Sequence, residues 1–474
     1  MKFLLFPTQL FPKLPKGNYD IYLVEDPIYF TRFKFHKLKL AYQRACMKKY
    51  ADKHNLRYVD CADVPEFYST LRNITIIDPV DHLLVDKLLS LGIDLEIMET
   101  PQFLTNSIEL DDLRDKCFDG TRYDQTKFYK AQRKKLDILM DGDKPRGGKW
   151  TYDFENRKRL PADTTLPKLP LSIINNKYTR EAITYVENNW SDNYGSLDNW
   201  IYPIDRTHSL KWLNEFIKQR LGCFGPYQDY VSPRYPFMCH SVISPMLNVG
   251  LLLDSDVLDA IKKVDADVPI ASLEGFIRQV IGWRNFIRLV YVYERDMRDS
   301  NMLGHRRPAG EQWWVGIGVA PIDYILDNIR KYAYAHHIER LMFLGNFMLL
   351  CQLDPNEVYR MFMEWTVDSY DWVMVPNIYG MSQFAAGPVM TGRPYFSSSN
   401  YVSKMSDFSR RSEWVLVWDA LYYKFIDDNA KMLSVNYATA SAVARWKKMS
   451  SGRKKELLMQ ADEFLKKLDG IKPS

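Results

Sequence analysis

The sequence lacks any apolar run close to the roughly 20 residues that a membrane-spanning helix needs. It also lacks a CxxC pair, because its six cysteines are scattered singly along the chain (Cys46, Cys61, Cys117, Cys223, Cys239 and Cys351). The cysteine pattern predicts reduced thiols in an intracellular protein and argues against a disulfide framework or a thiolate metal site. The short apolar N-terminus runs into prolines without a cleavage site, so we expect no signal peptide, a cytoplasmic location and no membrane partner.

Neither basic nor acidic residues are in strong excess. The chain has 64 basic and 59 acidic residues, which is compatible with local binding of a polyanion but does not require it. Aromatic residues are abundant instead, at 14%, with 12 Trp and 30 Tyr. Core filling is the favoured interpretation, although such a surplus also suits stacking of flat ligands or bases, or electron transfer along aromatic rings.

The first part of the chain alternates strand and helix patterns. Expected strands lie at 2–6, 20–26, 56–60, 74–78 and 95–100, with helices near 34–53 and 82–91. Alternation of this kind predicts a parallel sheet covered by helices on both faces. No GxGxxG follows the first strand, which excludes the dinucleotide-binding fingerprint.

The second part is expected to be almost wholly helical. Residues 127–172 are polar and rich in Gly, Pro and basic residues, so we interpret them as an interdomain linker. We therefore predict an α/β domain over 1–126, the linker, and a large all-α domain over 173–474 with 3.6-residue periodicity. Within it, 377–400 is full of Gly, Ser and Pro, and a loop of that length in a helical domain is often functional.

Two adjacent histidines, His336 and His337, lie in the apolar run AYAHHIERLMFLGNF, which we expect to be helical. A single buried histidine is usually structural. Two neighbours point about 100° apart on a helix, so both cannot face one apolar layer. Arg340 follows one turn later and needs an anionic partner. The group suits a pocket in which a proton is donated near neutral pH, although the pattern alone does not name the reaction.

Two further segments carry candidate ligand-binding residues. Ser241 and Ser244 lie near an expected helix start, where hydroxyl and backbone N–H groups can bind phosphate; an ordinary helix cap is the alternative. Arg278 and Trp283 lie in EGFIRQVIGWR, where a solvent-to-core helix with a buried Trp is equally compatible.

Five segments together carry a family resemblance. HSVISPMLNVGLL, EGFIRQVIGWR, AYAHHIERLMFLGNF, WVMVPNIYGMSQFA and RPYFSSSNYVSKMSDF occur in this order. The chain resembles the bacterial-type (6-4) photolyases, also called iron–sulfur bacterial cryptochromes and photolyases, within the cryptochrome/photolyase family. The resemblance covers nearly the whole chain. It implies a Rossmann-like, antenna-type first domain and a helical FAD-binding catalytic domain.

The resemblance implies a light-driven DNA repair flavoprotein, a lyase using blue light. Excited reduced FAD would give an electron to a (6-4) photoproduct that is flipped out of damaged DNA into the pocket. Residues implied to hold FAD are Ser241, Ser244, Arg278, Trp283, Asn377, Gln383 and Asn400. Residues implied at the lesion are His336, His337 and Arg340 of the HHxxR motif, with Tyr395 and Tyr401; His337 is the favoured proton donor. A monomer is expected.

The sequence departs from this family in four places. The family's cluster cysteines correspond here to Pro321, Ser409, Ser412 and about Leu416, so we expect no iron–sulfur cluster and no bound metal. The expected Trp–Tyr pair reads Met361 and Phe362, which leaves Trp313, Trp314, Trp365 and Trp372 as candidate electron carriers. The LGDQL-like antenna segment reads FPTQL although Glu25, His36 and Lys37 are kept, so binding of a lumazine-type antenna chromophore stays open. The family's acidic residue in its FADGG segment is replaced here by Ala386.

Three other functions compete with (6-4) repair. A cryptochrome-like blue-light photoreceptor would bind FAD but repair little. A cyclobutane dimer photolyase would need no histidine donor, and a non-enzymatic DNA-binding remnant would need neither motif set. Retention of HHxxR and both tyrosines favours (6-4) repair.

Overall fold

The computed structural model describes residues 1–169, 175–264 and 267–470. Its first part is a five-stranded sheet with the order β3-β2-β1-β4-β5, in which every neighbouring pair is parallel. The strands are β1 (Lys2–Leu5), β2 (Asp20–Val24), β3 (Arg57–Val59), β4 (Asn73–Ile77) and β5 (Asp94–Met98). The predicted parallel sheet is confirmed, and the chain reverses its direction of winding between β1 and β4, as in doubly wound folds.

The long helix between β2 and β3 starts slightly later than the sequence pattern predicts. It is α2, which spans Lys37–His54. The Nδ1 atom of His36 accepts a hydrogen bond from the backbone N–H of Leu38 at 3.0 Å, so the histidine side chain caps the helix and defines its first turn. An 18-residue helix that is buried along most of its length closes one face of the sheet.

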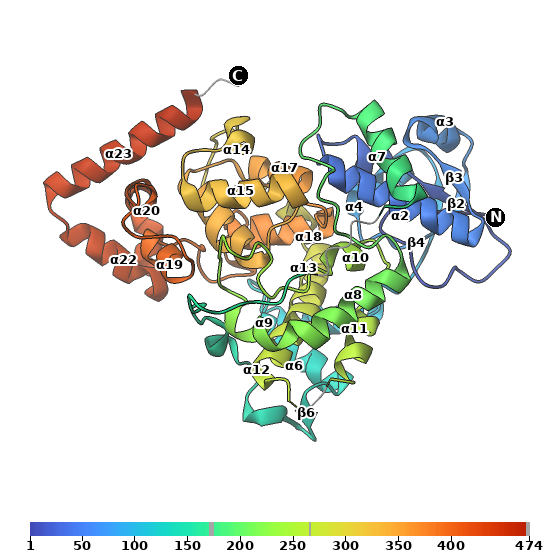
Figure 1. Ribbon diagram of the computed structural model, residues 1–474, viewed down its shortest axis with the longest axis horizontal. Helices are drawn as coiled ribbons and strands as arrows, with labels where there is room; N and C mark the ends of the chain where they lie inside the picture. Colours follow the sequence, from blue (N-terminus) through green and yellow to red (C-terminus); the bar gives the residue numbers. More distant parts are fainter. Residues whose placement is uncertain (170–174, 265–266, 471–474) are drawn as a thin grey trace.

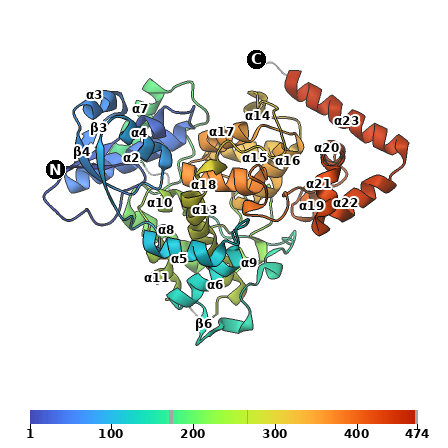
Figure 2. The same ribbon diagram turned by 180° about the vertical axis from the view of Figure 1, so that it is seen from behind.

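The rest of the described chain is predominantly helical, as predicted. The other α-helices are α1 (Pro27–Phe30), α3 (Val64–Ser69), α4 (His82–Ser90), α5 (Ser107–Cys117), α6 (Gln125–Leu136), α7 (Lys177–Asn189), α8 (Arg206–Gln219), α9 (Leu221–Tyr227), α10 (Ser244–Asn248), α11 (Asp254–Ile261), α12 (Ile270–Ile277), α13 (Asn285–Tyr293), α14 (Gln312–Val315), α15 (Ala320–Tyr332), α16 (Asn346–Leu350), α17 (Pro355–Trp365), α18 (Asp371–Val375), α19 (Ser399–Lys404), α20 (Trp414–Asp428), α21 (Ala430–Val435), α22 (Tyr437–Lys448) and α23 (Ser451–Gly470). The sheet and the α22–α23 pair lie at opposite ends of the molecule in both views (Figures 1 and 2).

The segment interpreted as a linker contains ordered structure. Helix α6 begins at Gln125 and packs against the 278–284 segment, and the Tyr129 hydroxyl donates to Glu274 Oε1 at 3.0 Å. A short hairpin of β6 (Met140–Asp141) and β7 (Lys144–Pro145) follows. Part of the expected linker therefore packs on the helical half, while the domain limits at 126 and 172 stay predictions.

Helix α2 carries several of the contacts that join the sheet domain to the helical half. Helix α7, which follows the linker, packs against α2. The buried Lys39 of α2 donates from Nζ to the carbonyl oxygens of Met363 at 2.8 Å and Ser369 at 2.6 Å. Burial lowers the pKa of Lys39 to about 7. The sheet domain is therefore bound directly to the last turn of α17 and to the segment that follows it.

Three helices of the second half contain π-helical turns. These are η4 (Arg278–Arg284), η6 (Glu339–Gly345) and η7 (Pro376–Ser382). A π turn accommodates an extra residue and redirects the side chains around it, and such turns are frequent at functional sites. Each of the three holds at least one residue predicted above for the flavin or lesion pocket.

Two local predictions need correction. The run from Ala333 is not one helix, because α15 ends at Tyr332, Ala333 adopts φ 50°, and helical structure resumes only at His337. The segment 377–400 is not a continuous loop, because it begins within the π turn η7 and ends in α19. Among the described residues, no helix combines the length and apolar character needed to cross a membrane.

Candidate functional site

His336 and His337 occupy different positions around a helix start. His336 precedes the helix and is 1% exposed, whereas the His337 side chain is 38% exposed. Their ring centroids lie 6.1 Å apart with an interplanar angle of 59°. The two rings therefore diverge, as the sequence indicated, but the cause is the break in the helix at Ala333 rather than helical rotation.

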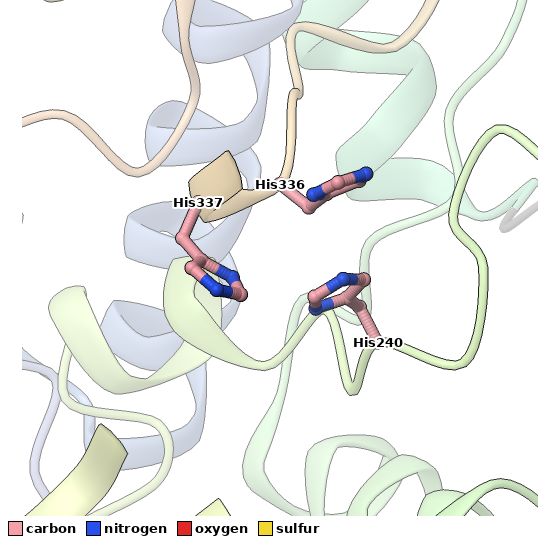
Figure 3. Close-up of side chains that lie close together, drawn as sticks. All are labelled: His240, His336 and His337. Carbon is pink, nitrogen blue, oxygen red and sulfur yellow. The ribbon is translucent and has the colours of Figure 1, made fainter. Parts of the chain in front are cut away.

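A third histidine joins them. The ring of His240 stacks on that of His336 with centroids 4.3 Å apart and an interplanar angle of 13°, and its centroid lies 5.3 Å from that of His337 (Figure 3). Burial lowers the pKa of both His240 and His336 well below the ordinary histidine value, and the neighbouring imidazoles add to the effect. Both buried rings are therefore neutral at pH 7.

His337 is paired with a carboxylate at the surface of the site. Its Nε2 lies 3.3 Å from Asp229 Oδ1, and Asp229 Oδ2 lies 3.6 Å from Arg157 Nε. Arg157 also pairs with Asp153, which lies 3.4 Å from Arg278 Nη2. A chain of charges thus connects the histidine to Arg278, and the segment before residue 172 contributes two of its members.

Arg340 has the anionic partner that the sequence required. Its Nη2 donates to Asp368 Oδ1 at 2.8 Å, and its Nε donates to the Ala335 carbonyl oxygen at 2.6 Å. Burial opposes the charge of Arg340, but the Asp368 carboxylate and the nearby Tyr334 and Tyr202 together outweigh this effect and raise its pKa. The hydroxyl of Ser244 donates to Asp368 Oδ2 at 2.6 Å. One carboxylate therefore brings together a residue predicted for the flavin and one predicted for the lesion.

Glu339 lies within the HHxxR motif and faces inward. Its Oε2 accepts from the backbone N–H of His336 at 2.9 Å, which fixes the start of the helix. Burial raises the pKa of Glu339 to about 8, so its carboxyl group is mostly protonated at pH 7.

The other predicted flavin residues are placed on two neighbouring segments. Gln383 donates from Nε2 to the Gly345 carbonyl oxygen at 3.0 Å, but its Oε1 is buried without a hydrogen-bond partner. Asn377 donates to the Val373 carbonyl oxygen at 2.8 Å within its own helix. Asn400 is solvent-exposed in α19. The structure therefore joins Gln383 to the HHxxR helix and leaves Asn400 at the surface.

The remaining predicted residues are half-buried. Ser241 accepts on its carbonyl oxygen from Trp212 Nε1 at 2.8 Å, and Trp283 packs against Phe286 with ring centroids 5.9 Å apart. The guanidinium carbon of Arg393 lies 6.0 Å from the ring centroid of Tyr395. Burial raises the pKa of Tyr401, and the Asp229 carboxylate adds to this effect. Tyr401 is thus the tyrosine that shares the surroundings of the histidine pair.

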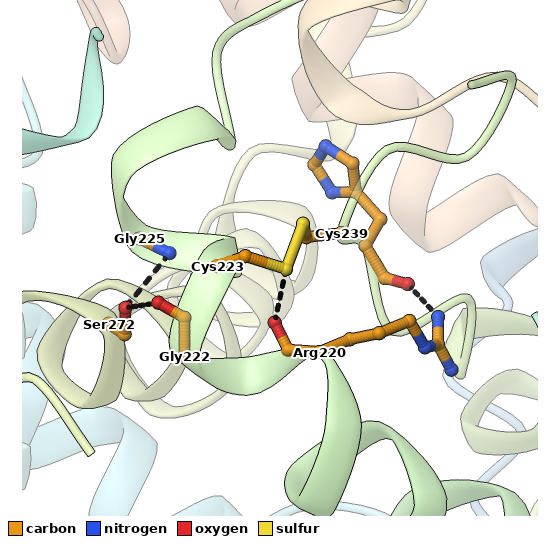
Figure 4. Close-up of a disulfide and its surroundings, with 7 residues drawn as sticks. Arg220, Gly222, Cys223, Gly225, Cys239 and Ser272 are labelled. Atoms are coloured by element: carbon orange, nitrogen blue, oxygen red, sulfur yellow. Dashed lines mark hydrogen bonds between the residues drawn. A yellow bond between two sulfur atoms is a disulfide. The ribbon is translucent and has the colours of Figure 1, made fainter. Parts of the chain in front are cut away.

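A disulfide next to the site contradicts the prediction of reduced thiols for two of the six cysteines. Cys223 of α9 and Cys239 are bonded, with their Cα atoms 5.9 Å apart, and the next residue is His240 (Figure 4). The Arg220 guanidinium donates to the His240 carbonyl oxygen. A separation of 16 residues without a CxxC motif gave no signal, because the fold alone brings α9 and the segment before α10 together.

The candidate electron carriers fall into separate groups. Trp314 packs against Trp365 with ring centroids 5.6 Å apart and against Tyr194 at 4.7 Å. Trp313 packs against Phe347 at 6.2 Å, and Trp372 against Phe103 at 5.1 Å. The pair at Met361 and Phe362, where the family resemblance leads one to expect Trp and Tyr, is buried in α17.

Sequence reasoning missed three residues of the site, namely Asp229, His240 and Asp368. His240 opens the quoted segment HSVISP and could have been suspected from that position. The two aspartates lie far along the chain from the histidines, among other acidic residues, and nothing in their surroundings marked them.

Comparisons with known proteins identify the family of the chain. Residues 3–202 match the family model for deoxyribodipyrimidine photo-lyase-related proteins. The chain is 37% identical over 355 residues to a (6-4) photolyase of Agrobacterium fabrum, an alignment that covers 72% of this chain and 70% of the relative. An uncharacterized protein R855 of Acanthamoeba polyphaga mimivirus is 53% identical over 88 residues, which are 19% of this chain and 72% of that one.

A solved structure shares the fold over the whole chain. The crystal structure of a bacterial class III photolyase from Agrobacterium tumefaciens aligns over 98% of both chains with a TM-score of 0.58 and 16% sequence identity. This likeness supports the order of a parallel sheet followed by a helical half. Together with the identity to the (6-4) photolyase over more than two thirds of each sequence, it shows that the chain belongs to the cryptochrome/photolyase family.

Proposed function

We propose that the protein is a light-driven DNA photolyase that reverses (6-4) photoproducts. The named relative of Agrobacterium fabrum supports the reaction class. The observation that carries the choice of lesion is the His337–Asp229 pair, in which an accessible imidazole is held by a carboxylate beside two buried neutral histidines.

The residues present fit an FAD. Gln383 Oε1 and Ser399 Oγ are buried without hydrogen-bond partners, which is typical of groups that contact a ligand. Arg278 and Ser244 would hold the phosphates, and Gln383 and Asn377 would lie near the ring system. When bound and reduced, FAD supplies the electron after absorbing light.

The chain's own residues would position and protonate the lesion. The damaged bases must leave the duplex to be reached, and Tyr401 and Tyr395 would form walls of the pocket that receives them. His337 would donate the proton, because a flipped base can reach a half-exposed ring but not the buried His336. Arg340, paired with Asp368, would hold the helix start in place.

The experiment that tests this proposal uses one lesion at a time. Oligonucleotides with a single (6-4) photoproduct or a single cyclobutane dimer are illuminated with blue light in the presence of the reduced protein, and products are separated chromatographically. We expect reversal of the (6-4) lesion only. Reversal of the dimer would make the protein a dimer photolyase, and a flavin-bound protein that repairs neither would be a photoreceptor.

We further propose that the protein contains no iron–sulfur cluster and acts as a cytoplasmic monomer. Pro321, Ser409, Ser412 and Leu416 offer no thiolate at the positions where relatives are expected to bind a cluster. Iron analysis of protein purified without oxygen should find no iron, and size-exclusion chromatography should give the monomer mass. Mass spectrometry of the extracted chromophores tests separately whether an antenna is bound beside the FAD.

A further inference from the structure

Three histidines from two distant segments converge beside the proposed lesion pocket. His240 precedes α10, whereas His336 lies just before the helix that His337 begins, and one ring nitrogen from each histidine lies within 4.8 Å of the others (Figure 3). Only eight histidines occur in the chain, so three in one place are a concentrated set of imidazole ligands.

Each ring keeps a nitrogen that no protein group uses. His240 Nε2 lies 3.1 Å from the Gln228 carbonyl oxygen, so Nε2 carries the proton and Nδ1 has a free lone pair. His337 Nε2 lies 3.3 Å from Asp229 Oδ1, which likewise leaves Nδ1. His336 is buried; its Nε2 lies 3.5 Å from Glu339 Oε1 without forming a hydrogen bond, and its Nδ1 has no hydrogen-bond partner. Such unpaired buried groups are costly unless a ligand satisfies them.

We propose that His240, His336 and His337 form a binding site for a borderline transition-metal ion such as Zn²⁺. Three imidazoles that leave one position open are an established ligand set for this ion, and imidazole is a poor ligand for Mg²⁺ or Ca²⁺. Asp229 and the Gln228 carbonyl oxygen have the role of outer ligands, because they hold the second nitrogen of a ligating histidine and fix its orientation.

Binding requires one ring to turn. A metal ion lies in the plane of each imidazole that binds it, and the parallel rings of His240 and His336 are stacked 4.3 Å apart. Zn–N bonds of about 2.0–2.1 Å in a tetrahedral site bring the nitrogens to about 3.4 Å from one another, closer than the present limit of 4.8 Å. Turning His336 breaks no hydrogen bond, although its Nε2 then leaves the 3.5 Å contact with Glu339 Oε1.

The metal ion and the proton compete for the same nitrogen, Nδ1 of His337. A metal on His337 Nδ1 occupies the lone pair that a proton would need, so the loaded protein cannot donate a proton to the lesion. This regulatory consequence rests on the proposed (6-4) repair function, whereas metal binding itself does not.

Metal binding is tested on the full-length, flavin-loaded protein after treatment with a chelator. Zn²⁺ is titrated by calorimetry, and Co²⁺ serves as a probe of the coordination geometry by visible absorption. The variant H240F keeps an aromatic ring stacked against His336 but removes one imidazole ligand. The matched control is H208F, at a histidine that pairs with Asp205 and whose side chain is 58% exposed.

We expect one Zn²⁺ per wild-type and H208F protein, and at least tenfold weaker binding by H240F. Asp229→Asn tests the same site without removing a ligand and should weaken binding about 10-fold or more. Absence of stoichiometric binding by the wild type would overturn the site, and so would binding by H240F and D229N as tight as that of the wild type at unchanged melting temperatures.

Repair assays separate the two proposals. If Zn²⁺ binds through His240 and stops (6-4) repair, both the site and its regulatory consequence are supported. If Zn²⁺ binds but repair continues at the same rate, the regulatory consequence is wrong. If the metal-free protein repairs nothing while Zn²⁺ still binds, the proposed function fails and the metal site stands.

Discussion

Ser244 and Arg340 bind the same carboxylate, that of Asp368, at 2.6 Å and 2.8 Å from its two oxygens. The shared aspartate lies between α17 and α18, next to the carbonyl groups that hold Lys39 of the sheet domain. The proposed flavin and lesion residues are therefore held in one hydrogen-bonded arrangement.

Replacing Asp368 with Asn should leave Arg340 buried without a compensating charge. We expect a loss of on the order of 3 kcal/mol in the free energy of unfolding, measured by urea denaturation, and reduced flavin retention. The control is D86N, because Asp86 pairs with Arg295 and both side chains are 53% exposed. That surface pair should contribute at most about 1 kcal/mol. Equal losses in the two variants would contradict the role given to Asp368.

Replacing His337 with Asn should remove the proton donor. We expect the rate of (6-4) repair to fall about 100-fold or more, because that is the usual contribution of a positioned general acid. Flavin absorbance and melting temperature should stay at wild-type values, and the exposed control H208N should repair normally. A H337N protein with full repair activity would exclude this histidine as the donor.

The stability of the protein should depend on the ionisation of Glu339. Its folded pKa of about 8 exceeds the ordinary value of 4.5, so the folded state binds the extra proton. The stabilisation is complete below pH 4.5 and is lost as the pH rises towards 8, by up to several kcal/mol. Glu339→Gln keeps an acceptor for the His336 N–H but cannot ionise. The wild type should therefore lose stability relative to the variant between pH 5 and pH 8. The unfolding free energy of the variant minus that of the wild type should rise over this range, and a constant difference would refute the assignment.

The Cys223–Cys239 bond should be detectable and stabilising. Denatured, unreduced protein should show four free thiols, from the buried Cys46, Cys61, Cys117 and Cys351. Closing a loop of this length contributes about 3 kcal/mol, so a reductant should lower the melting temperature of the wild type. The double variant C223S/C239S is the control, since it should melt at the same temperature with and without reductant. Six free thiols in the unreduced wild type would contradict the bond.

Much of the fold could be predicted from periodicity. The strands β1 to β5 are short β-branched or apolar runs between amphipathic helices, and a parallel sheet is the arrangement that buries most of them, although β5 at the sheet edge stays largely exposed. The break at Ala333 could not be predicted, because an alanine with positive φ has no sequence signature and is held by tertiary contacts such as the Val367 N–H bond to its carbonyl oxygen.

The site was predictable only where a motif marked it. Arg340 needed an anion, and the sequence showed this need, but the identity of Asp368 depended on how α17 and α18 pack. His240 opens the motif HSVISPMLNVGLL, but a single histidine before a serine has many ordinary roles. Its importance arises from stacking on His336, a contact between segments almost one hundred residues apart.

The return of the chain to the sheet domain at α7 affects how the protein can be divided. After β5 the chain enters the helical half through α5 and α6, and then comes back to pack α7 on α2 before leaving again. The two halves are thus interlaced rather than joined by one tether. A fragment that ends at residue 126 exposes the α2 surface that α7 covers, whereas one that ends near residue 190 keeps it closed. Both halves of the intact chain should therefore unfold in a single cooperative transition.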